Sequence, residues 1–598
     1  MSGSTNKLLG LICLVFLYSH NVWGQADTII LGKGNNANII VSMSDEVVEG
    51  SASQTTSNSG FLPNENKASR FLSQATLGYN YADIEMVTQQ GIEDWLESQL
   101  AMERGEYLLQ SVRDYVTFAE EKLGESVNSS DRMWKYAWWQ YQMGNSDLVR
   151  QRVALALSEI IVVSEISNFN GNGYALADFY DLFLEHALGN YRDLLQDVTL
   201  HASMANYLTY INNPKTDTTI NRYPDENYAR EVMQLFTIGL HELNDDGSWI
   251  LDSLDQPIPT YDNYEIGEFA KVFTGFSWGD RDQFNKGRAR DTSYIPELKM
   301  FDEYHEPGEK YLLNGFVVPD RNPVDGLADV NDALDNLFDH PNIGPFISRL
   351  LIQRLVTSNP PPDYIARVTA AFNDNGNGVK GDMKAVIRAI FLDPLANDCA
   401  SGELMDFGML REPFIRYFQI HKAFNASTAS GQFRNDMNKV YEFVEQRPLM
   451  SPSVFNFFQY DYQPLGPIND NDLVAPEFQI TDAKTMAGYI NGLYYWVMNN
   501  NLADEYDIYG MEPDSTYADQ ITQIDLSTEM MYTNDDELHI LLDHLNMLLA
   551  HGRLSDQTEE TIIEALKQFP NGDEEDQEDR VRLAIYFVMT APEYLING

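Results

Sequence analysis

Hydrophobic residues recur at intervals of three or four positions through most of the chain after residue 65, which is the spacing of one face of an α-helix. This spacing is found at residues 67–78, 81–100, 133–163, 178–188, 191–200, 224–239, 262–278, 327–355, 362–372, 383–392, 413–424, 435–445, 481–499, 537–551, 557–568 and 579–589. Residues 279–330 and 446–480 lack it and are rich in Gly, Pro, Asp, Asn or aromatic residues. We therefore predict a mainly α, large multi-helix globular protein with long irregular loops.

The first 65 residues follow other patterns. Lys7, an apolar run over 8–18 and the small residue Gly24 are typical of a signal peptide cleaved before Gln25. Two short β-prone runs at 28–31 and 38–41 predict a hairpin, and a polar linker follows. The predicted organisation is a signal peptide (1–24), a β-prone segment and linker (25–65), a main helical domain (66–400) and a C-terminal helical region packed on it (401–598).

These features predict export to the periplasm, the cell surface or the medium. No other apolar run reaches the roughly 18 to 20 residues that cross a bilayer, so the mature chain is predicted to have no transmembrane segment. Cleavage leaves Cys399 as the single cysteine, which excludes an intramolecular disulfide.

The composition is strongly acidic. Asp and Glu number 90 against 40 Lys and Arg, a net charge of −50, and such a surface repels phosphate backbones and disfavours nucleic-acid binding. A hydrophobic content of 43% is nevertheless that of a folded protein. Two explanations of this charge are open: it keeps the protein soluble, or it captures divalent cations.

Two helices with clear start signals enclose an acidic turn. Pro224 and Asp225 suit a helix start, and Glu226 and Arg230 are spaced for an intrahelical ion pair. Asp262 with Glu265 predicts a capping box at the start of the second helix. An aromatic cluster earlier in the chain, Trp134, Trp138 and Trp139, fits either a buried helix face or a sugar-stacking platform.

Six motifs occur in an order that resembles the bacterial domain-of-unknown-function family 1800. They are SRFLSQATLG (69–78), RQRVALALS (150–158), ENYARE (226–231), YHEPGEK (304–310), LIQRLV (351–356) and PEFQI (476–480). The likeness extends from about Glu65 to the C-terminus. It implies a large, exported, mostly helical protein whose gene often neighbours a family similar to alkaline phosphatases and sulfatases, and therefore a shared extracellular task.

The loop that carries YHEPGEK holds the best catalytic candidates. His305, Glu306 and Lys310 supply a neutral base or metal ligand, a carboxylate and an ammonium group within seven residues. Such a cluster could polarise and protonate a bound oxyanion. The alternative is a hydrogen-bonded loop that anchors the irregular region to the helices.

A second polar set lies on the preceding helices. His201 follows Asp197 by four residues, which places both on one helical face, and His186 lies one helix earlier. A metal site using these groups and Glu231 is one hypothesis. A buried polar network joining His201, Arg230 and Glu231 is the other.

A glycine-rich segment between two predicted helices resembles an EF-hand loop. Asn373, Asn375 and Asn377 fall at loop positions 1, 3 and 5, and Val379 falls at the position that supplies a backbone carbonyl. The twelfth position is a lysine, so Asp374 or Asp382 would have to replace the usual glutamate. The candidate calcium ligands are Asn373, Asn375, Asn377, Val379 and Asp382; the alternative is a glycine-rich turn.

Several common catalytic motifs do not occur in the sequence. It contains no His-Glu-x-x-His, Gly-x-Ser-x-Gly, Gly-x-x-x-x-Gly-Lys or Cys-x-x-Cys. We therefore expect a secreted protein that binds an extracellular polymer or protein partner at the cell surface, with calcium as the candidate cofactor. The alternatives are an extracellular hydrolase or transferase acting on polysaccharide or its ester groups through the His305 loop, and an assembly partner of the phosphatase- or sulfatase-like neighbour.

Overall fold

The computed structural model describes residues 56–57, 60–61, 64–167, 169, 171–397, 406–429, 431–502 and 522–597. Helices dominate this part of the chain, and its strands are two-residue antiparallel pairs, so the predicted mainly α fold is confirmed. The predicted signal peptide, the hairpin at 28–41 and Cys399 lie outside the described residues.

The helices follow the predicted order. In the first half they are α3 (Glu65–Ala75), α4 (Tyr81–Gln90), α5 (Ile92–Leu100), α6 (Leu108–Leu123), α7 (Asp131–Gly144), α8 (Leu148–Ile160), α9 (Gly173–His186), α10 (Tyr191–Leu200), α11 (Ala202–Tyr207), α12 (Asn227–Gln234), α13 (Asn263–Val272), α14 (Gly326–Asp339), α15 (Ile343–Leu355), α16 (Pro362–Asn373), α17 (Met383–Phe391) and α18 (Pro394–Asn397). In the second half they are α19 (Pro413–Ala423), α20 (Asn438–Val444), α21 (Pro467–Asp470), α22 (Ala483–Leu493), α23 (Leu538–Leu545), α24 (Asp556–Leu566), α25 (Glu574–Thr590) and α26 (Pro592–Leu595).

Short elements join these helices. Strand pairs are β1 (Thr56–Ser57) with β2 (Gly60–Phe61), β3 (Phe276–Ser277) with β4 (Lys299–Met300), β5 (Lys310–Tyr311) with β6 (Val317–Val318), and β7 (Met409–Leu410) with β8 (Ile596–Asn597). The 3-10 helices are η1 (Asp291–Tyr294), η2 (Asp302–Tyr304), η3 (Leu313–Gly315), η5 (Pro476–Ile480) and η8 (Glu529–Tyr532). Single π-helical turns, η6 (Tyr494–Met498) and η9 (Asn546–Ala550), extend α22 and α23.

Local capping explains where several helices begin. The capping box predicted for α13 forms, with the Asp262 N–H donating to Glu265 Oε2 at 3.0 Å. Helix α12 begins at Asn227, three residues after the predicted start at Pro224, because Asp225 instead closes a turn by accepting from the Asn227 N–H at 2.9 Å. Both helices then bury their apolar faces in the core.

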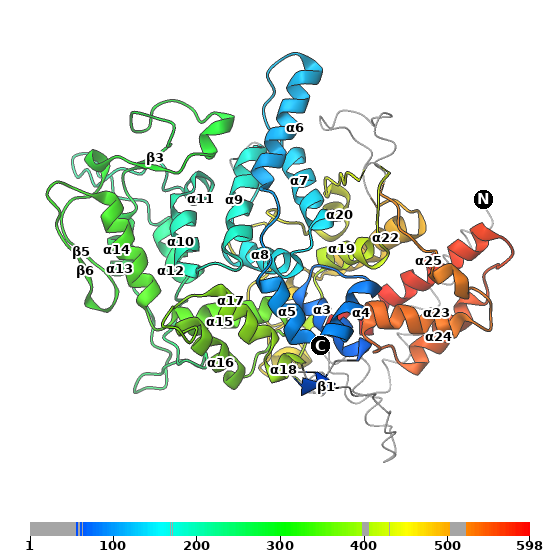
Figure 1. Ribbon diagram of the computed structural model, residues 1–598. Coiled ribbons are helices and arrows are strands. Elements are labelled where there is room, and N and C mark those ends of the chain that lie inside the picture. Colours follow the sequence, from blue (N-terminus) through cyan, green and yellow to red (C-terminus); the bar gives the residue numbers. More distant parts are fainter. Residues whose placement is uncertain are drawn as a thin grey trace.

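Helix α8 lies near the middle of the molecule, between an end built from α13, α14 and β5–β6 and an opposite end built from α23–α25 (Figure 1). Every residue from Val149 to Ile160 is buried. Trp134, Trp138 and Trp139 of α7 are fully buried against aromatic residues of α9 and α19, so they belong to the core and form no exposed sugar-stacking platform.

One continuous hydrophobic core includes residues from both predicted helical domains, 66–400 and 401–598. The β7–β8 pair joins residue 409 to the end of the described chain, and Ser73 Oγ on α3 donates to Asn597 Oδ1 at 2.9 Å. The two regions therefore share one core. The division at residue 400 stays a prediction.

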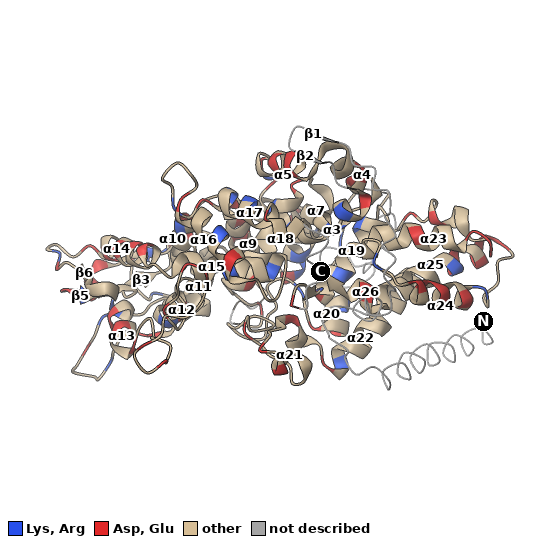
Figure 2. Ribbon diagram, turned by 90° about the horizontal axis from the view of Figure 1, so that it is seen from below, with Lys and Arg blue, Asp and Glu red and all other residues tan. Residues whose placement is uncertain are grey.

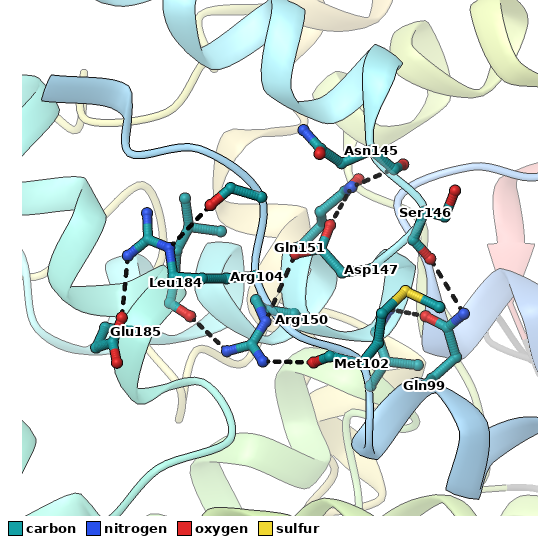
Figure 3. Close-up of polar contacts among 12 residues, drawn as sticks. Gln99, Met102, Arg104, Asn145, Ser146, Asp147, Arg150, Gln151, Leu184 and Glu185 are labelled. Atoms are coloured by element: carbon teal, nitrogen blue, oxygen red, sulfur yellow. Dashed lines mark hydrogen bonds and ion pairs between the residues drawn. The ribbon is translucent and has the colours of Figure 1, made fainter. Parts of the chain in front are cut away.

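The first turn of α8 is fixed by side chains of the RQRVALALS motif (Figure 3). Arg150 donates to the carbonyl of Leu184 at 2.8 Å and to that of Met102 at 2.9 Å, which joins α8 to α9 and to the segment after α5. Gln151 donates to Asp147 Oδ1 at 2.9 Å. Buried donors paired in this way hold the helix in one position.

Acidic positions recur along the whole molecule, on α4, α5, α13, α14 and α23–α25 among others, and basic positions are fewer (Figure 2). Among the described residues, none of the helices combines the length and apolar character needed to cross a membrane.

Candidate functional site

The predicted catalytic residues belong to a closed ion network. His305 Nδ1–H donates to the Thr274 carbonyl at 2.9 Å, and His305 Nε2 lies 3.1 Å from Asp329 Oδ2 and 3.3 Å from Lys310 Nζ. Lys310 and Arg321 also bind Asp329 directly. Burial acts to raise the pKa of Asp329, but hydrogen bonds from His305 and Lys310 outweigh it and hold that pKa below its ordinary value.

This network encloses two of the three predicted catalytic side chains, and the third, Glu306, is half-buried beside it. His305 is 0% and Lys310 1% exposed, and Glu306 Oε2 accepts from the Thr216 N–H at 2.6 Å. The Glu306 N–H in turn donates to Thr274 Oγ1 at 2.9 Å. The contacts are those of the anchoring-loop alternative, and the catalytic role stays a prediction.

The second predicted set is not joined in the structure. His201 Nε2 lies 3.3 Å from Asp178, and Asp197 lies 2.6 Å from His186 instead of binding His201. Arg230 forms the predicted intrahelical pair with Glu226 at 3.3 Å.

Glu231 is buried apart from these pairs. Burial raises its pKa, and its Oε2 has no hydrogen-bond partner. Among the described residues, no group of three or more His, Cys, Asp or Glu side chains is arranged to hold a metal ion.

The candidate calcium loop is closed by its own hydrogen bonds. Asn375 Oδ1 accepts from the N–H groups of Asn377 and Val379 at 2.9 and 3.3 Å, and the Val379 carbonyl accepts from the Asn375 N–H at 3.0 Å. Asp382 caps α17 by accepting from the Lys384 N–H at 3.0 Å. The loop therefore uses the oxygens of Asn375, Val379 and Asp382, three of the five candidate calcium ligands, for its own hydrogen bonds.

The first predicted calcium ligand faces another element. Asn373 ends α16, and its side-chain oxygen lies directly over Gly344 at the start of α15. This arrangement differs from an EF-hand loop, in which position 1 converges with positions 3 and 5. Calcium binding stays a prediction.

The same loop forms one wall of a large open cleft between α5, α16 and α17. The cleft has a volume of about 810 Å³. It is lined by Glu97, Leu100, Ala101, Arg367, Ala371, Asp374, Asn375, Gly376, Asn377, Asp382, Lys384, Ala385, Arg388, Ala389, Leu392, Asp393 and Pro394. Small apolar residues alternate here with charged and amide side chains.

Most charges in this cleft are paired. Arg367 binds Asp393 through two nitrogens at 2.6 and 3.0 Å, and Arg388 lies 2.8 Å from both Glu93 and Glu97. Lys384 is exposed and has no ion-pair partner within 4.0 Å among the residues that the structure describes. It is therefore the cation that the cleft offers to a ligand.

A second candidate site, which the sequence did not indicate, lies at the centre of the fold. We define the central carboxyl centre as Arg152 and Glu159 of α8, Arg354 of α15, Glu412 before α19 and Glu477 of η5. All five side chains are buried. Arg354 Nε lies 3.7 Å from Glu159 Oε2, and Ser358 Oγ donates to Glu477 Oε2 at 3.3 Å.

Two of the carboxyl groups in this centre, those of Glu159 and Glu477, have raised pKa values. Burial, followed by the proximity of Glu412, raises the pKa of Glu159 well above its ordinary value. Burial raises the pKa of Glu477 to about 8 and lowers that of Arg152. Strongly perturbed groups of this kind gather at functional sites and in structural ion networks alike.

Comparison with known proteins places these residues within one family. The model of the family described as "Protein of unknown function (DUF1800)" matches residues 70–596. The chain belongs to this family. No curated protein and no solved structure matches it. The DUF1800 match includes the whole central carboxyl centre, the His305 network and the cleft.

Three motifs of the DUF1800 resemblance meet in the central carboxyl centre. Arg152 comes from RQRVALALS, Arg354 from LIQRLV and Glu477 from PEFQI. Each of these apolar motifs contains a charged residue, and a buried charge must be paired. This feature of the sequence could have indicated that the three charged residues meet in the core.

Proposed function

We propose that this DUF1800 protein binds an extracellular, hydroxyl-rich polymer in the cleft between α5, α16 and α17. The observation that supports this function is the cleft itself, whose volume of about 810 Å³ lies in the range of ligand sites and whose wall carries many hydrogen-bonding groups. The three predicted catalytic residues, His305, Glu306 and Lys310, are absent from its lining.

The lining residues suit polar rings. Ala101, Ala371, Ala385 and Ala389 give a floor of small side chains, on which the flat face of a sugar ring can lie. Asn377, the carboxylates and Lys384 supply donors and acceptors above that floor. The net charge of −50 opposes a highly anionic polymer, so neutral or weakly acidic polysaccharides are the best match.

Binding to a panel of neutral and uronic-acid polysaccharides, measured by affinity electrophoresis and calorimetry, tests the proposal. Ala389→Trp fills the cleft floor and should reduce affinity at least tenfold, and Lys384→Ala should reduce it severalfold. Lys567→Ala, an exposed lysine on the surface after α24, is the matched control and should bind as the parent does. Unchanged binding by a folded Ala389→Trp variant would refute the cleft as the site.

The two alternatives remain separate predictions. A hydrolase or transferase acting through the His305 loop requires that loop to open, because His305 and Lys310 are enclosed. An assembly partner of the phosphatase- or sulfatase-like neighbour predicts that the two proteins co-purify from cells expressing both.

A further inference from the structure

The segment between α12 and α13 forms a small closed arrangement of its own, here called the knob (residues 240–260). Three short stretches, centred on Glu242, Ile250 and Ile258, each pair with the other two. The Ile250 N–H donates to the Glu242 carbonyl at 2.8 Å, the Ile258 N–H to the Ile250 carbonyl at 3.0 Å, and the Glu242 N–H to the Ile258 carbonyl at 2.8 Å. The backbone groups of these three residues are therefore satisfied within the knob.

The knob is held at its base by hydrogen bonds. Asn342, a buried residue that precedes α15, accepts from the Leu243 N–H at 2.9 Å and donates to the His241 carbonyl at 2.8 Å. Thr260 Oγ1 donates to the Gly239 carbonyl at 2.6 Å, which joins the two ends of the knob. These bonds fix the position of the knob on the helical body.

Large apolar side chains lie on the outside of the knob. Trp249, Leu251 and Leu254 are 55%, 47% and 76% exposed, and Leu240 and Ile250 are exposed as well. In the part of the chain that the structure describes, the other six tryptophans are buried. Exposed apolar residues gathered in this way mark binding surfaces, whereas scattered single ones need no explanation.

The charge of the knob is of one sign. Residues 240–260 contain five Asp and Glu and no Lys or Arg. Asp245 and Asp246 lie in the turn before Trp249, and Asp252 and Asp255 lie in the turn after it. An apolar centre between two acidic turns is complementary to an apolar pocket with lysine or arginine at its rim.

We propose that the knob docks into an apolar pocket of a second protein, with Trp249, Leu251 and Leu254 inside the pocket and basic residues of that protein facing the aspartates. A projection fits a concave partner, and aromatic anchors seated in pockets carry most of the affinity of such interfaces. The aspartates repel an anionic bilayer and a second copy of this chain, whose net charge is −50. A sugar polymer would stack on Trp249 alone and leave the aliphatic side chains exposed.

The knob and the cleft lie on different faces of α16. A Cβ atom at Gly247, in the first turn of the knob, would lie 3.0 Å from Ile365 Cδ1. The α16 residues that line the cleft are Arg367, Ala371 and Asp374, about half a turn round the helix from Ile365. No residue of the knob lines the cleft, so docking and polymer binding can be tested separately.

Selection of peptides from a displayed random library on the immobilised full chain tests the chemistry of the partner. The selected peptides should combine large apolar residues with Lys and Arg. When a synthetic peptide of this kind binds, the fluorescence of exposed Trp249 should shift to shorter wavelength. Raising sodium chloride from about 50 mM to about 500 mM should weaken the peptide severalfold, because salt screens the aspartates.

Variants of the knob test where the peptide binds. Trp249→Ala and Leu254→Ser should each weaken it at least about tenfold, whereas Leu123→Ser, at an exposed leucine that ends α6, should bind as the parent does. Asp245→Asn combined with Asp255→Asn keeps the size of both side chains and should remove most of the salt dependence. Urea unfolding should change little in every variant, which separates loss of binding from loss of the fold.

The proposal is overturned if the selection yields no peptide that binds the knob, if the selected peptides lack Lys and Arg, or if they bind Trp249→Ala and Leu254→Ser as tightly as the parent. It is also overturned if the Trp249 shift occurs with phosphatidylcholine vesicles or with a neutral polysaccharide. A dimer in sedimentation that Trp249→Ala abolishes would overturn it too, since the occupant would then be a second copy. Ala389→Trp, which fills the cleft, should leave peptide binding unchanged.

Discussion

Replacing Glu477 by glutamine should flatten the pH dependence of stability between pH 5 and pH 8. Glu477 is 1% exposed, and burial raises its pKa from the ordinary 4.5 to about 8. The folded state therefore keeps a proton that the unfolded state releases. The stability that comes from this proton is fully present below pH 4.5 and is lost as pH rises towards 8.

The size of the effect follows from the two pKa values. A difference of about 3.5 pH units, at about 1.4 kcal/mol for each unit, lowers the free energy of unfolding of the parent by about 5 kcal/mol between pH 4.5 and 8. Glutamine is neutral at every pH, so it contributes no such change in the free energy of unfolding with pH. Glu477→Gln should therefore match the parent near pH 5 and exceed its stability by several kcal/mol at pH 8.

Urea unfolding at pH 5, 6, 7 and 8 measures this difference. Repulsion among the 90 acidic residues also changes with pH, but it is shared by parent and variant and cancels when their curves are subtracted. Glu560→Gln removes an exposed carboxylate and should run parallel to the parent. Parallel curves for parent and Glu477→Gln would show that Glu477 is ionised in the fold and would refute the reasoning.

Two further variants test the other polar clusters. Asp329→Asn leaves buried Lys310 without its carboxylate and should lower the free energy of unfolding in urea by about 3 to 5 kcal/mol. The control, Asp335→Asn, breaks a surface pair with Arg192 and should lower it by under about 1 kcal/mol. Equal losses would contradict the ion network. Asp382→Ala removes the cap of α17 and should lower the free energy of unfolding by about 0.5 to 2 kcal/mol, by the same amount with calcium and with a chelator. The control Asp262→Ala, which removes the cap of the distant helix α13, should have an effect of the same size. A loss for Asp382→Ala that grows only in calcium would instead support the predicted calcium site.

The helices could be predicted because periodicity is a local property. The fully buried face of α13 and the tryptophans of α7 follow directly from spacing and residue type. Helix α6 was not predicted, although Leu108, Val112 and Val116 repeat at every fourth position. Their stripe is narrow and surrounded by charged residues, so the signal is weak beside that of its neighbours.

The site could be predicted only in part because its residues meet through tertiary packing. Spacing along α8 gives no information on whether Glu159 faces Glu412, which lies on another element far along the chain. The many polar residues of the loop at 304–310 made it a candidate site. In the structure, however, both His305 and Lys310 bind Asp329 of α14, a partner that the loop sequence does not reveal. The cleft arises where α5 approaches α16 and α17, an arrangement that local pattern does not encode.

The contact between Ser73 and Asn597 has a consequence for biosynthesis. These side chains are separated by 524 positions, and β8, which carries Asn597, also pairs with β7 at residues 409–410. Chain emerging from the ribosome or a membrane channel cannot close this seam until nearly all of it has appeared. Helix α3 can pack early against α4 and against Trp95 of α5, whereas its contacts with η9 and β8 must wait until residues 546–597 have been made.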